Sequence, residues 1–151
     1  MTNRREIAAS ITSSVVKYYT KKRFCVNAEL GLQSRRLGML RADVLALNMK
    51  HEIVIVEVKS SIADFKTDQK YHLYLPFCNK MYIACQPKLY EKIKDSVNED
   101  VGIMVVQDNG KLKVAKNAKS RIVDPETLLQ ILTRLAFRNA DHNRYKRRST
   151  R

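Results

Sequence analysis

Four consecutive apolar residues, Ile53-Val54-Ile55-Val56, are followed at once by Glu57-Val58-Lys59. Successive side chains of a strand point to opposite faces of its sheet, so this run is apolar on both faces. Such a run is typical of a central strand that is covered on both sides. It therefore predicts a sheet with helices packed on its two faces. Glu57 and Lys59 are two residues apart, so both should project from the same face where that strand ends.

The rest of the chain alternates helical and strand patterns around this run. Apolar residues at helical spacing predict a first helix over residues 4–22. A second helix should run from residue 62 to about residue 74 and stop at Pro76, and a last one should start with Asp124 as N-cap and Pro125 at its first position and reach at least residue 138. The order predicts an α/β fold, a mixed central sheet flanked by helices. Strands are expected over residues 24–32, 41–47, 53–59, 80–86, 101–107 and 111–114, with a basic turn over 31–38 and a short helix over 88–94.

The chain is strongly basic, with 29 Lys and Arg against 15 Asp and Glu in 151 residues and a formal net charge of +14. In a small domain this excess favours a polyanionic partner, nucleic acid before an anionic membrane surface. No run of about 20 apolar residues is present, so a membrane-spanning helix is not expected. The first residues lack the apolar run of a secretory signal, and the three cysteines form no CxxC pair. We expect a cytoplasmic protein with reduced, mostly buried thiols.

Asp43, on the strand before Glu57, suggests a function for the charged residues at the end of that strand. If the turn between the two strands centres near Lys50, antiparallel partners have numbers that sum to about 100, and Asp43 faces Glu57. Opposed residues have Cβ atoms about 4.5–5.5 Å apart, and two carboxylates that close repel each other unless a cation lies between them. A divalent metal would remove the repulsion, and oxygen ligands favour Mg²⁺ or Mn²⁺. An ion-pair cluster of Asp43, Glu57 and Lys59 is the structural alternative, and spacing alone does not separate the two.

The metal hypothesis leads to a specific chemistry. A metal held by Asp43, Glu57 and a backbone carbonyl, which we place at Val58, can bind a phosphate oxygen and lower the pKa of a bound water. Lys59 beside that water could orient it or stabilise the charge that develops on phosphorus. The set suits hydrolysis of a phosphodiester.

The same residues carry a family resemblance. Asp43, followed by Glu57-x-Lys59 at the end of an apolar strand, resembles the PD-(D/E)xK nuclease superfamily, which implies a restriction-endonuclease-like core in the order α-β-β-β-α-β. A closer resemblance is to the MmcB-like DNA repair proteins, over roughly residues 5–140 and most specifically over 41–84. This sequence departs from the family pattern with Leu40 for an Arg, Tyr71 for a Trp and Asn79 for an Asp, which affects substrate detail more than the metal ligands. The matching stretches are Glu29–Leu32, Arg41–Val44, Ile55–Ser61, Asp64–Tyr71, Tyr74–Lys80 and Met81–Ala84.

Other residues are expected to assist this site. Glu29 falls where the family pattern has an acid and is a candidate further metal ligand, with an exposed edge-strand acid as the alternative. Basic residues before the first acid are candidates for phosphate contacts, and two residues of the second helix should lie near the site. The expected nucleic-acid contacts are Arg35, Arg36, Arg41, Lys70 and Tyr74.

The sequence thus predicts one nuclease-like domain over residues 1–140 and a loose basic tail over 141–151. The function it favours is a metal-dependent DNA nuclease, with single-stranded or branched DNA among the substrates. Two alternatives stay open: a module with a nuclease fold that binds nucleic acid without cutting it, and a nuclease that processes RNA. Junction-cutting members of the superfamily often dimerise, so the resemblance also allows a homodimer.

Overall fold

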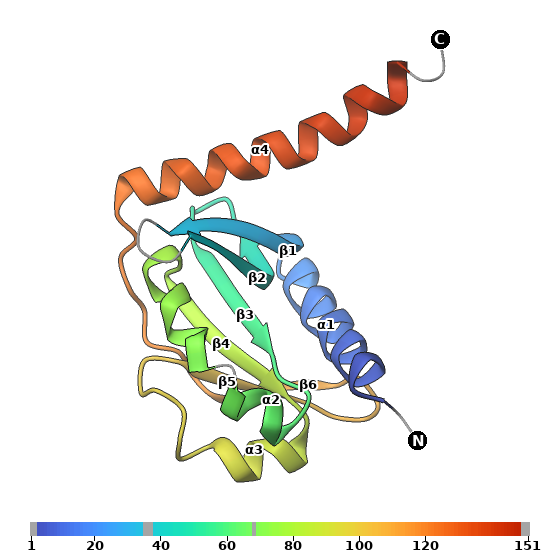
Figure 1. Cartoon of the computed structure of the whole chain (residues 1–151), viewed down its shortest axis with the longest axis vertical. Helices are drawn as coiled ribbons and strands as arrows, with labels where there is room; N and C mark the ends of the chain where they lie inside the picture. Colours follow the sequence, from blue (N-terminus) through green and yellow to red (C-terminus); the bar gives the residue numbers. More distant parts are fainter. Residues whose placement is uncertain (1–2, 35–37, 68, 149–151) are drawn as a thin grey trace.

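A six-stranded mixed sheet in the order β1-β2-β3-β4-β5-β6 forms the centre of the computed structural model (Figure 1). The structure describes residues 3–34, 38–67 and 69–148, with no side-chain description at 34, 69 and 141–148. Neighbouring strands pair antiparallel except β3 with β4 and β4 with β5, which are parallel. The expected α/β class with a mixed sheet between helices is confirmed. The strands are β1 Cys25–Ser34, β2 Gly38–Leu47, β3 Ile53–Val58, β4 Lys80–Cys85, β5 Gly102–Val106 and β6 Leu112–Lys116.

Each face of the sheet has its own apolar core. Helix α1 (Arg4–Lys21) covers one face through Ile11, Val15 and Tyr19. The opposite face is covered by α2 (Ile62–Thr67), the 3₁₀ helix η1 (Gln69–Phe77), α3 (Pro87–Ile93) and α4 (Pro125–Arg148). All six residues of β3 are buried, as expected for a central strand. Two cysteines are buried as expected, whereas Cys25 at the start of β1 is exposed.

The alternation of β1 and β2 is interrupted at one row of the sheet. Val44 faces the core under α1, whereas Ala42, which should share its face, packs in the opposite core. Glu29 and Asp43 face each other in this register but are missing from the ladder, and Glu29 has a left-handed backbone with φ of 54°. Such irregularities re-aim side chains and are frequent beside active sites. The strands also run further than expected, so Gly31 lies inside β1 and not at the edge of a turn.

The segment after β3 is not the single helix expected over residues 62–74. Helix α2 ends at Thr67, and η1 then runs through Pro76 to Phe77. Packing explains the change, because the Tyr71 ring stacks on Phe65 and the Tyr71 hydroxyl accepts a hydrogen bond from the backbone N–H of Asn98. These contacts hold η1 in place as a 3₁₀ helix, which is wound more tightly than an α-helix continued from α2 would be.

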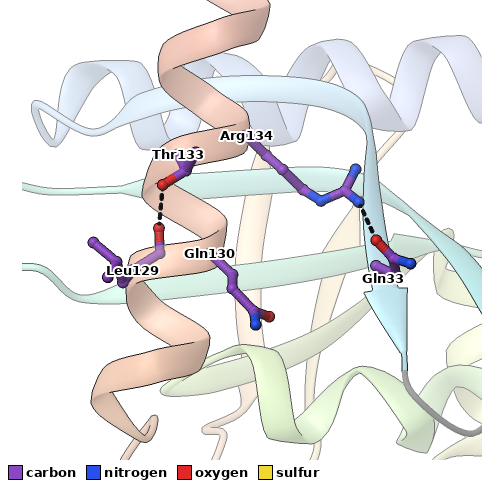
Figure 2. Close-up of a pocket in the computed structure, with 5 residues that line it drawn as sticks. All are labelled: Gln33, Leu129, Gln130, Thr133 and Arg134. Atoms are coloured by element: carbon purple, nitrogen blue, oxygen red, sulfur yellow. Dashed lines mark hydrogen bonds between the residues drawn. The ribbon is translucent and has the colours of Figure 1, made fainter.

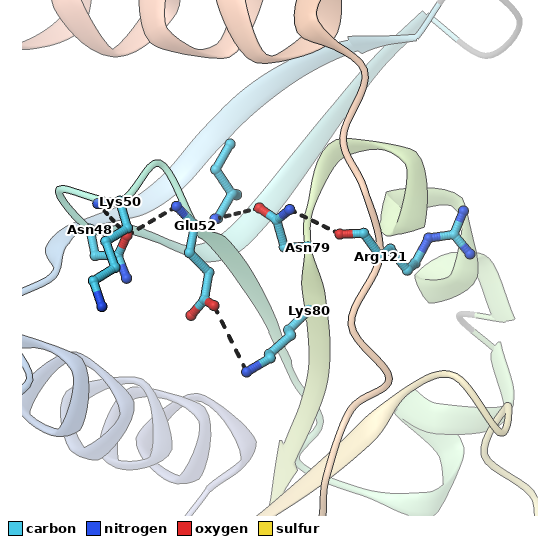
Figure 3. Close-up of polar contacts among 7 residues, drawn as sticks. Asn48, Lys50, Glu52, Asn79, Lys80 and Arg121 are labelled. Carbon is cyan, nitrogen blue, oxygen red and sulfur yellow. Dashed lines mark hydrogen bonds and ion pairs between the residues drawn. The ribbon is translucent and has the colours of Figure 1, made fainter.

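Asn79 joins three segments at the beginning of β3 and β4 (Figure 3). Its side-chain oxygen accepts a hydrogen bond from the backbone N–H of Ile53 at 2.8 Å, and its amide nitrogen donates to the carbonyl of Arg121 at 2.9 Å. The backbone N–H of Arg121 returns a hydrogen bond to the Asn79 carbonyl. Beside it, Lys80 and Glu52 form an ion pair at 3.9 Å. These contacts fix the end of the sheet that lies away from Glu57 and Lys59.

Helix α4 begins as predicted, because the Asp124 side chain accepts hydrogen bonds from the backbone N–H groups of Glu126 and Thr127. Ile131 and Leu135 bury this helix in the core that also contains η1. Figure 2 shows Arg134 reaching to Gln33 on β1, where its guanidinium donates a hydrogen bond to the side-chain oxygen of Gln33 at 3.0 Å. Both residues line a cavity of about 600 Å³.

The far end of α4 differs from the loose tail expected from the sequence. The helix continues to Arg148, and no glycine or proline interrupts it after Pro125. In Figure 1 its second half extends past the sheet. The basic composition of this stretch therefore did not predict its backbone, because Arg and Lys are themselves good helix formers.

Candidate active site

Strand β3 carries Glu57 to the sheet face covered by η1, and Lys59 follows directly after the strand. Both side chains are almost inaccessible to solvent, with 3% of Glu57 and 2% of Lys59 exposed. Parallel pairing with β4 holds this strand end, since Glu57 pairs with Ile83 and the backbone N–H of Lys59 donates to the Ala84 carbonyl at 3.0 Å. Burial of charged groups is costly unless they have partners or bind a metal. The partners of these two side chains therefore decide what the site can do.

Asp43 and Glu57 meet across β2 and β3 as the register predicts. The pairs Val44–Val56 and Leu45–Ile55 each sum to 100, so Asp43 lies opposite Glu57 in the next row. In this row, hydrogen bonds from the backbone to side chains take the place of the backbone hydrogen bonds between the two strands. The Glu57 Oε1 atom accepts a hydrogen bond from the backbone N–H of Asp43 at 3.0 Å, and the Asp43 Oδ2 atom accepts one from the backbone N–H of Val58 at 2.8 Å. The two carboxyl groups lie close enough together that each affects the pKa of the other.

The environment of this pair favours a proton or a cation between the carboxyl groups. Burial, followed by the charge of Asp43, raises the pKa of Glu57 from its ordinary 4.5 to about 9. Burial also raises the pKa of Asp43, although the hydrogen bond from Val58 and the charge of Lys59 act in the opposite direction. The Lys59 ammonium lowers the pKa of both acids without cancelling the effect of burial. Near neutral pH the pair therefore retains a proton unless another cation replaces it.

These residues line an open cavity of about 410 Å³. Arg41 and Lys70 are exposed at this cavity and bring positive charge to it, beside the three acids Asp43, Glu57 and Asp64. Tyr74 is buried and donates a hydrogen bond from its hydroxyl to the Arg41 carbonyl at 2.7 Å, which connects η1 to β2. The cavity is lined by Met39, Leu40, Arg41, Asp43, Glu57, Val58, Lys59, Asp64, Lys70 and Tyr74.

The sequence matches the profile of the MmcB-like DNA repair proteins over residues 2–148, nearly the whole chain. The chain belongs to the MmcB-like DNA repair family. The fold agrees with that of a protein of unknown function from Silicibacter pomeroyi, SPO1766, with a TM-score of 0.76, 23% identity, and coverage of 93% of this chain and 91% of the other. A second solved structure, the protein of unknown function AF1548, has 13% identity, covers 82% of this chain and 66% of its own, and has a TM-score of 0.39, too low to compare folds. No curated protein matches the sequence.

Within this family member, the structure brings together most of the residues that we expected at the site. Asp43, Glu57, Val58 and Lys59 line the cavity, as do the expected nucleic-acid contacts Arg41, Lys70 and Tyr74. Arg35 and Arg36 lie outside the described residues. None of the helices in the described part has both the length and the apolar character needed to cross a membrane.

Two further acids lie near the carboxyl pair. Glu29 is exposed on edge strand β1, opposite Asp43 in the strand register, and is not among the residues that line the cavity. Asp64, which we did not assign to the site, does line it. Its Oδ2 atom accepts from the backbone N–H of Ser60, its own N–H donates to the Ser61 hydroxyl, and its charge raises the pKa of Asp43. The Ser61-x-x-Asp64 capping pattern, which begins two residues after Lys59, could have placed it here.

A divalent metal fits the carboxyl pair but not a larger acidic cluster. Within residues 3–34, 38–67 and 69–148 there is no group of three or more His, Cys, Asp or Glu side chains arranged to hold a metal ion. Mg²⁺ does not require one, because it keeps several waters and is often bound by one or two carboxylates together with substrate phosphate. Asp43 and Glu57, whose side chains meet across β2 and β3, provide such a two-carboxylate set.

Proposed function

We propose that this MmcB-like chain is a metal-dependent deoxyribonuclease that hydrolyses phosphodiester bonds, with Asp43, Glu57 and Lys59 as catalytic residues. The observation that carries the proposal is the buried carboxyl pair with a lysine beside it, in a cavity that the exposed Arg41 and Lys70 also line. An ion-pair cluster that only supports the fold would not need exposed basic residues at a cavity. DNA as the substrate rests on the description of the family as DNA repair proteins. The same set supports membership of the PD-(D/E)xK superfamily.

Asp43 and Glu57 are the proposed ligands of Mg²⁺ or Mn²⁺, together with the Val58 carbonyl. When bound, the metal would supply Lewis-acid activation of a phosphate oxygen and a more acidic water. The two backbone hydrogen bonds described above hold one oxygen of each carboxylate in place, which leaves the second oxygen of each acid for the metal. This preorganisation limits the motion that the site would need during the reaction.

Lys59 is proposed to act on the reacting atoms. Its side chain is buried beside both acids, so its ammonium has a restricted position and a low-dielectric environment. There it would orient the attacking water and stabilise the negative charge that develops on the phosphoryl oxygens. In the overall reaction the water oxygen bonds to phosphorus, the bond from phosphorus to one ester oxygen breaks, and a proton reaches the departing oxygen.

Arg41 and Lys70 are proposed to bind the phosphates that flank the scissile bond, because both are exposed at the cavity. Tyr74 fixes the backbone of Arg41 through its 2.7 Å hydrogen bond and thereby positions that contact. Such phosphate contacts orient a strand but do not read its sequence.

Cleavage assays with defined variants test the proposal. The protein would be incubated with labelled single-stranded, duplex, flapped and four-way-junction DNA and with RNA, in Mg²⁺, Mn²⁺ or chelator. We expect metal-dependent cleavage of at least one DNA. Asp43→Asn should abolish it, and Lys59→Met should reduce the rate by a factor on the order of 10²–10³, as the loss of one charge-stabilising donor does in other enzymes. Circular dichroism would verify that each variant folds.

Lys80→Gln is the matched control for Lys59→Met, because Lys80 lies at the other end of the same two strands and pairs with Glu52 at the surface. It should cleave at the wild-type rate. Cleavage that persists in Asp43→Asn would remove the proposed site. Binding of DNA without cleavage under every condition would favour the non-cutting module, and cleavage of RNA alone would change the substrate.

A further inference from the structure

A second basic cavity lies next to the carboxyl site, on the side of α1. Its volume is about 360 Å³, and it is lined by residues of α1 and of the segment after β3. Ser60 follows Lys59 directly, and Asp64 lines both this cavity and the one that contains Asp43. The two cavities are therefore adjacent, with Asp64 between them. The lining residues are Arg4, Arg5, Ala8, Ser60, Ala63, Asp64 and Thr67.

Arg4 and Arg5 occupy an unfavourable position for the stability of α1. They are the first two residues of the helix, where the aligned peptide dipoles place positive charge and cations are destabilising. Both side chains are exposed, and among the residues that the structure describes neither has an ion-pair partner. The acid of this turn, Glu6, is used in the capping box with Asn3. Folding therefore offers no reason for this arginine pair.

We infer that Arg4 and Arg5 form a second phosphate-binding subsite for the nucleic acid that the carboxyl site acts on. Guanidinium groups bind phosphate oxygens with two donors each, and the cavity beside them can admit a phosphate and its sugar. Arg41 and Lys70 hold the strand at the first cavity, and Arg4 and Arg5 hold it at the second. The strand between them passes the end of β3. The substrate is thus a strand that continues on both sides of the scissile phosphate.

This inference rests on the proposed function for the identity of the ligand, but binding can be measured without cleavage. DNA affinity would be determined by fluorescence anisotropy in chelator, for a labelled duplex and a labelled single strand, at several salt concentrations. The double variant Arg4→Gln/Arg5→Gln should bind on the order of tenfold more weakly at 0.1 M salt. The slope of log K against log salt should fall by about 1.8 for the duplex and about 1.4 for the single strand, since two phosphate contacts are lost.

Lys17→Gln/Lys21→Gln is the matched control, because it removes the same charge from exposed positions in the second half of the same helix. This control should keep the wild-type salt slope. Thermal melts add a second measurement. If Arg4 and Arg5 had a structural role, the melting temperature of the arginine variant would fall. The arginine variant should melt at the same or a higher temperature, because it removes cations from the positive end of the dipole, while the lysine variant should melt lower.

The results separate the two hypotheses. A reduced salt slope in the arginine variant alone supports the subsite, even if the wild-type protein cleaves no substrate. Equal losses of affinity in both double variants would reduce the effect to net charge and overturn the inference. A lower melting temperature for the arginine variant, with no change in salt slope, would assign Arg4 and Arg5 a structural role and overturn it as well.

Discussion

The raised pKa of the buried Glu57 carboxyl predicts that the metal-free protein loses stability as the pH rises. The pKa of Glu57 is raised from 4.5 to about 9 in the folded state, first by burial and then by the charge of Asp43. Unfolding exposes the group to water, where it ionises near its ordinary value. Between these two values the folded state holds a proton that the unfolded state has released, so the free energy of unfolding falls with increasing pH.

The size of the effect follows from one retained proton. Each pH unit should lower the free energy of unfolding by up to about 1.4 kcal/mol, which gives about 4 kcal/mol between pH 5 and pH 8. That is a large part of the 5–15 kcal/mol that stabilises a typical domain. Glu57→Gln replaces the protonated acid by an amide that keeps an oxygen for the Asp43 N–H and gains a donor toward the Asp43 carboxylate. The variant should therefore lose most of this pH dependence and be the more stable protein at pH 8.

Urea denaturation in the presence of chelator would measure both proteins at half-unit steps of pH. Glu99→Gln is the control, because the Glu99 side chain is 84% exposed and its carboxylate stays in water in both states. Wild type and Glu99→Gln should show the same downward slope, and Glu57→Gln a flatter one. Parallel curves for wild type and Glu57→Gln over pH 5–8 would show that the pair does not hold a proton, and the reasoning from burial would be refuted.

Three further outcomes are expected. At pH 8, Mg²⁺ should raise the melting temperature of the wild-type protein and leave that of Asp43→Asn unchanged. The free energy of unfolding of the wild type should rise by about 2.7 kcal/mol when Mg²⁺ is at 100 times its Kd. Equal shifts in both proteins would exclude Asp43 as a ligand. Asn79→Ala removes hydrogen bonds to the Ile53 N–H and the Arg121 carbonyl and should cost about 2 kcal/mol in urea denaturation. Glu29→Gly removes the penalty of a left-handed backbone and should add up to about 1 kcal/mol, and a less stable variant would mean that the Glu29 side chain has a structural role.

The central part of the site could be predicted from sequence because it depends on strand rules. The apolar run of β3 indicates that this strand is buried in the centre of the sheet. The two-residue spacing puts Glu57 and Lys59 on one face, and the turn near Lys50 sets the register that brings Asp43 opposite Glu57. Each of these rules is local or involves neighbouring strands. The fold class, the order of the elements and the contact between the two acids were therefore accessible without coordinates.

The remaining features depend on contacts between distant residues. The change of face at Glu29 and Asp43 is not visible in the sequence, since a left-handed glutamate is uncommon and no glycine marks the position. Splitting of the helix after β3 follows from the stacking of Tyr71 on Phe65 and its hydrogen bond with Asn98, 27 residues later. Arg4 reaches the neighbourhood of the site only because α1 packs across the sheet, and no pattern near Arg4 indicates this.

The cost of the carboxyl pair and Lys59 to the fold supports a role in chemistry. Replacing buried ionic groups by apolar side chains of similar size is often neutral or stabilising, because burial removes them from water. Here one carboxyl group must keep a proton well above its ordinary pKa, and the rows above in β2 and β3 show that apolar pairs such as Val44–Val56 fit the same strands. Sites that sacrifice stability in this way are usually functional. The interruption at Glu29 acts in the same row, so the irregular backbone and the unfavourable charges coincide at the position where we propose that the phosphodiester is hydrolysed.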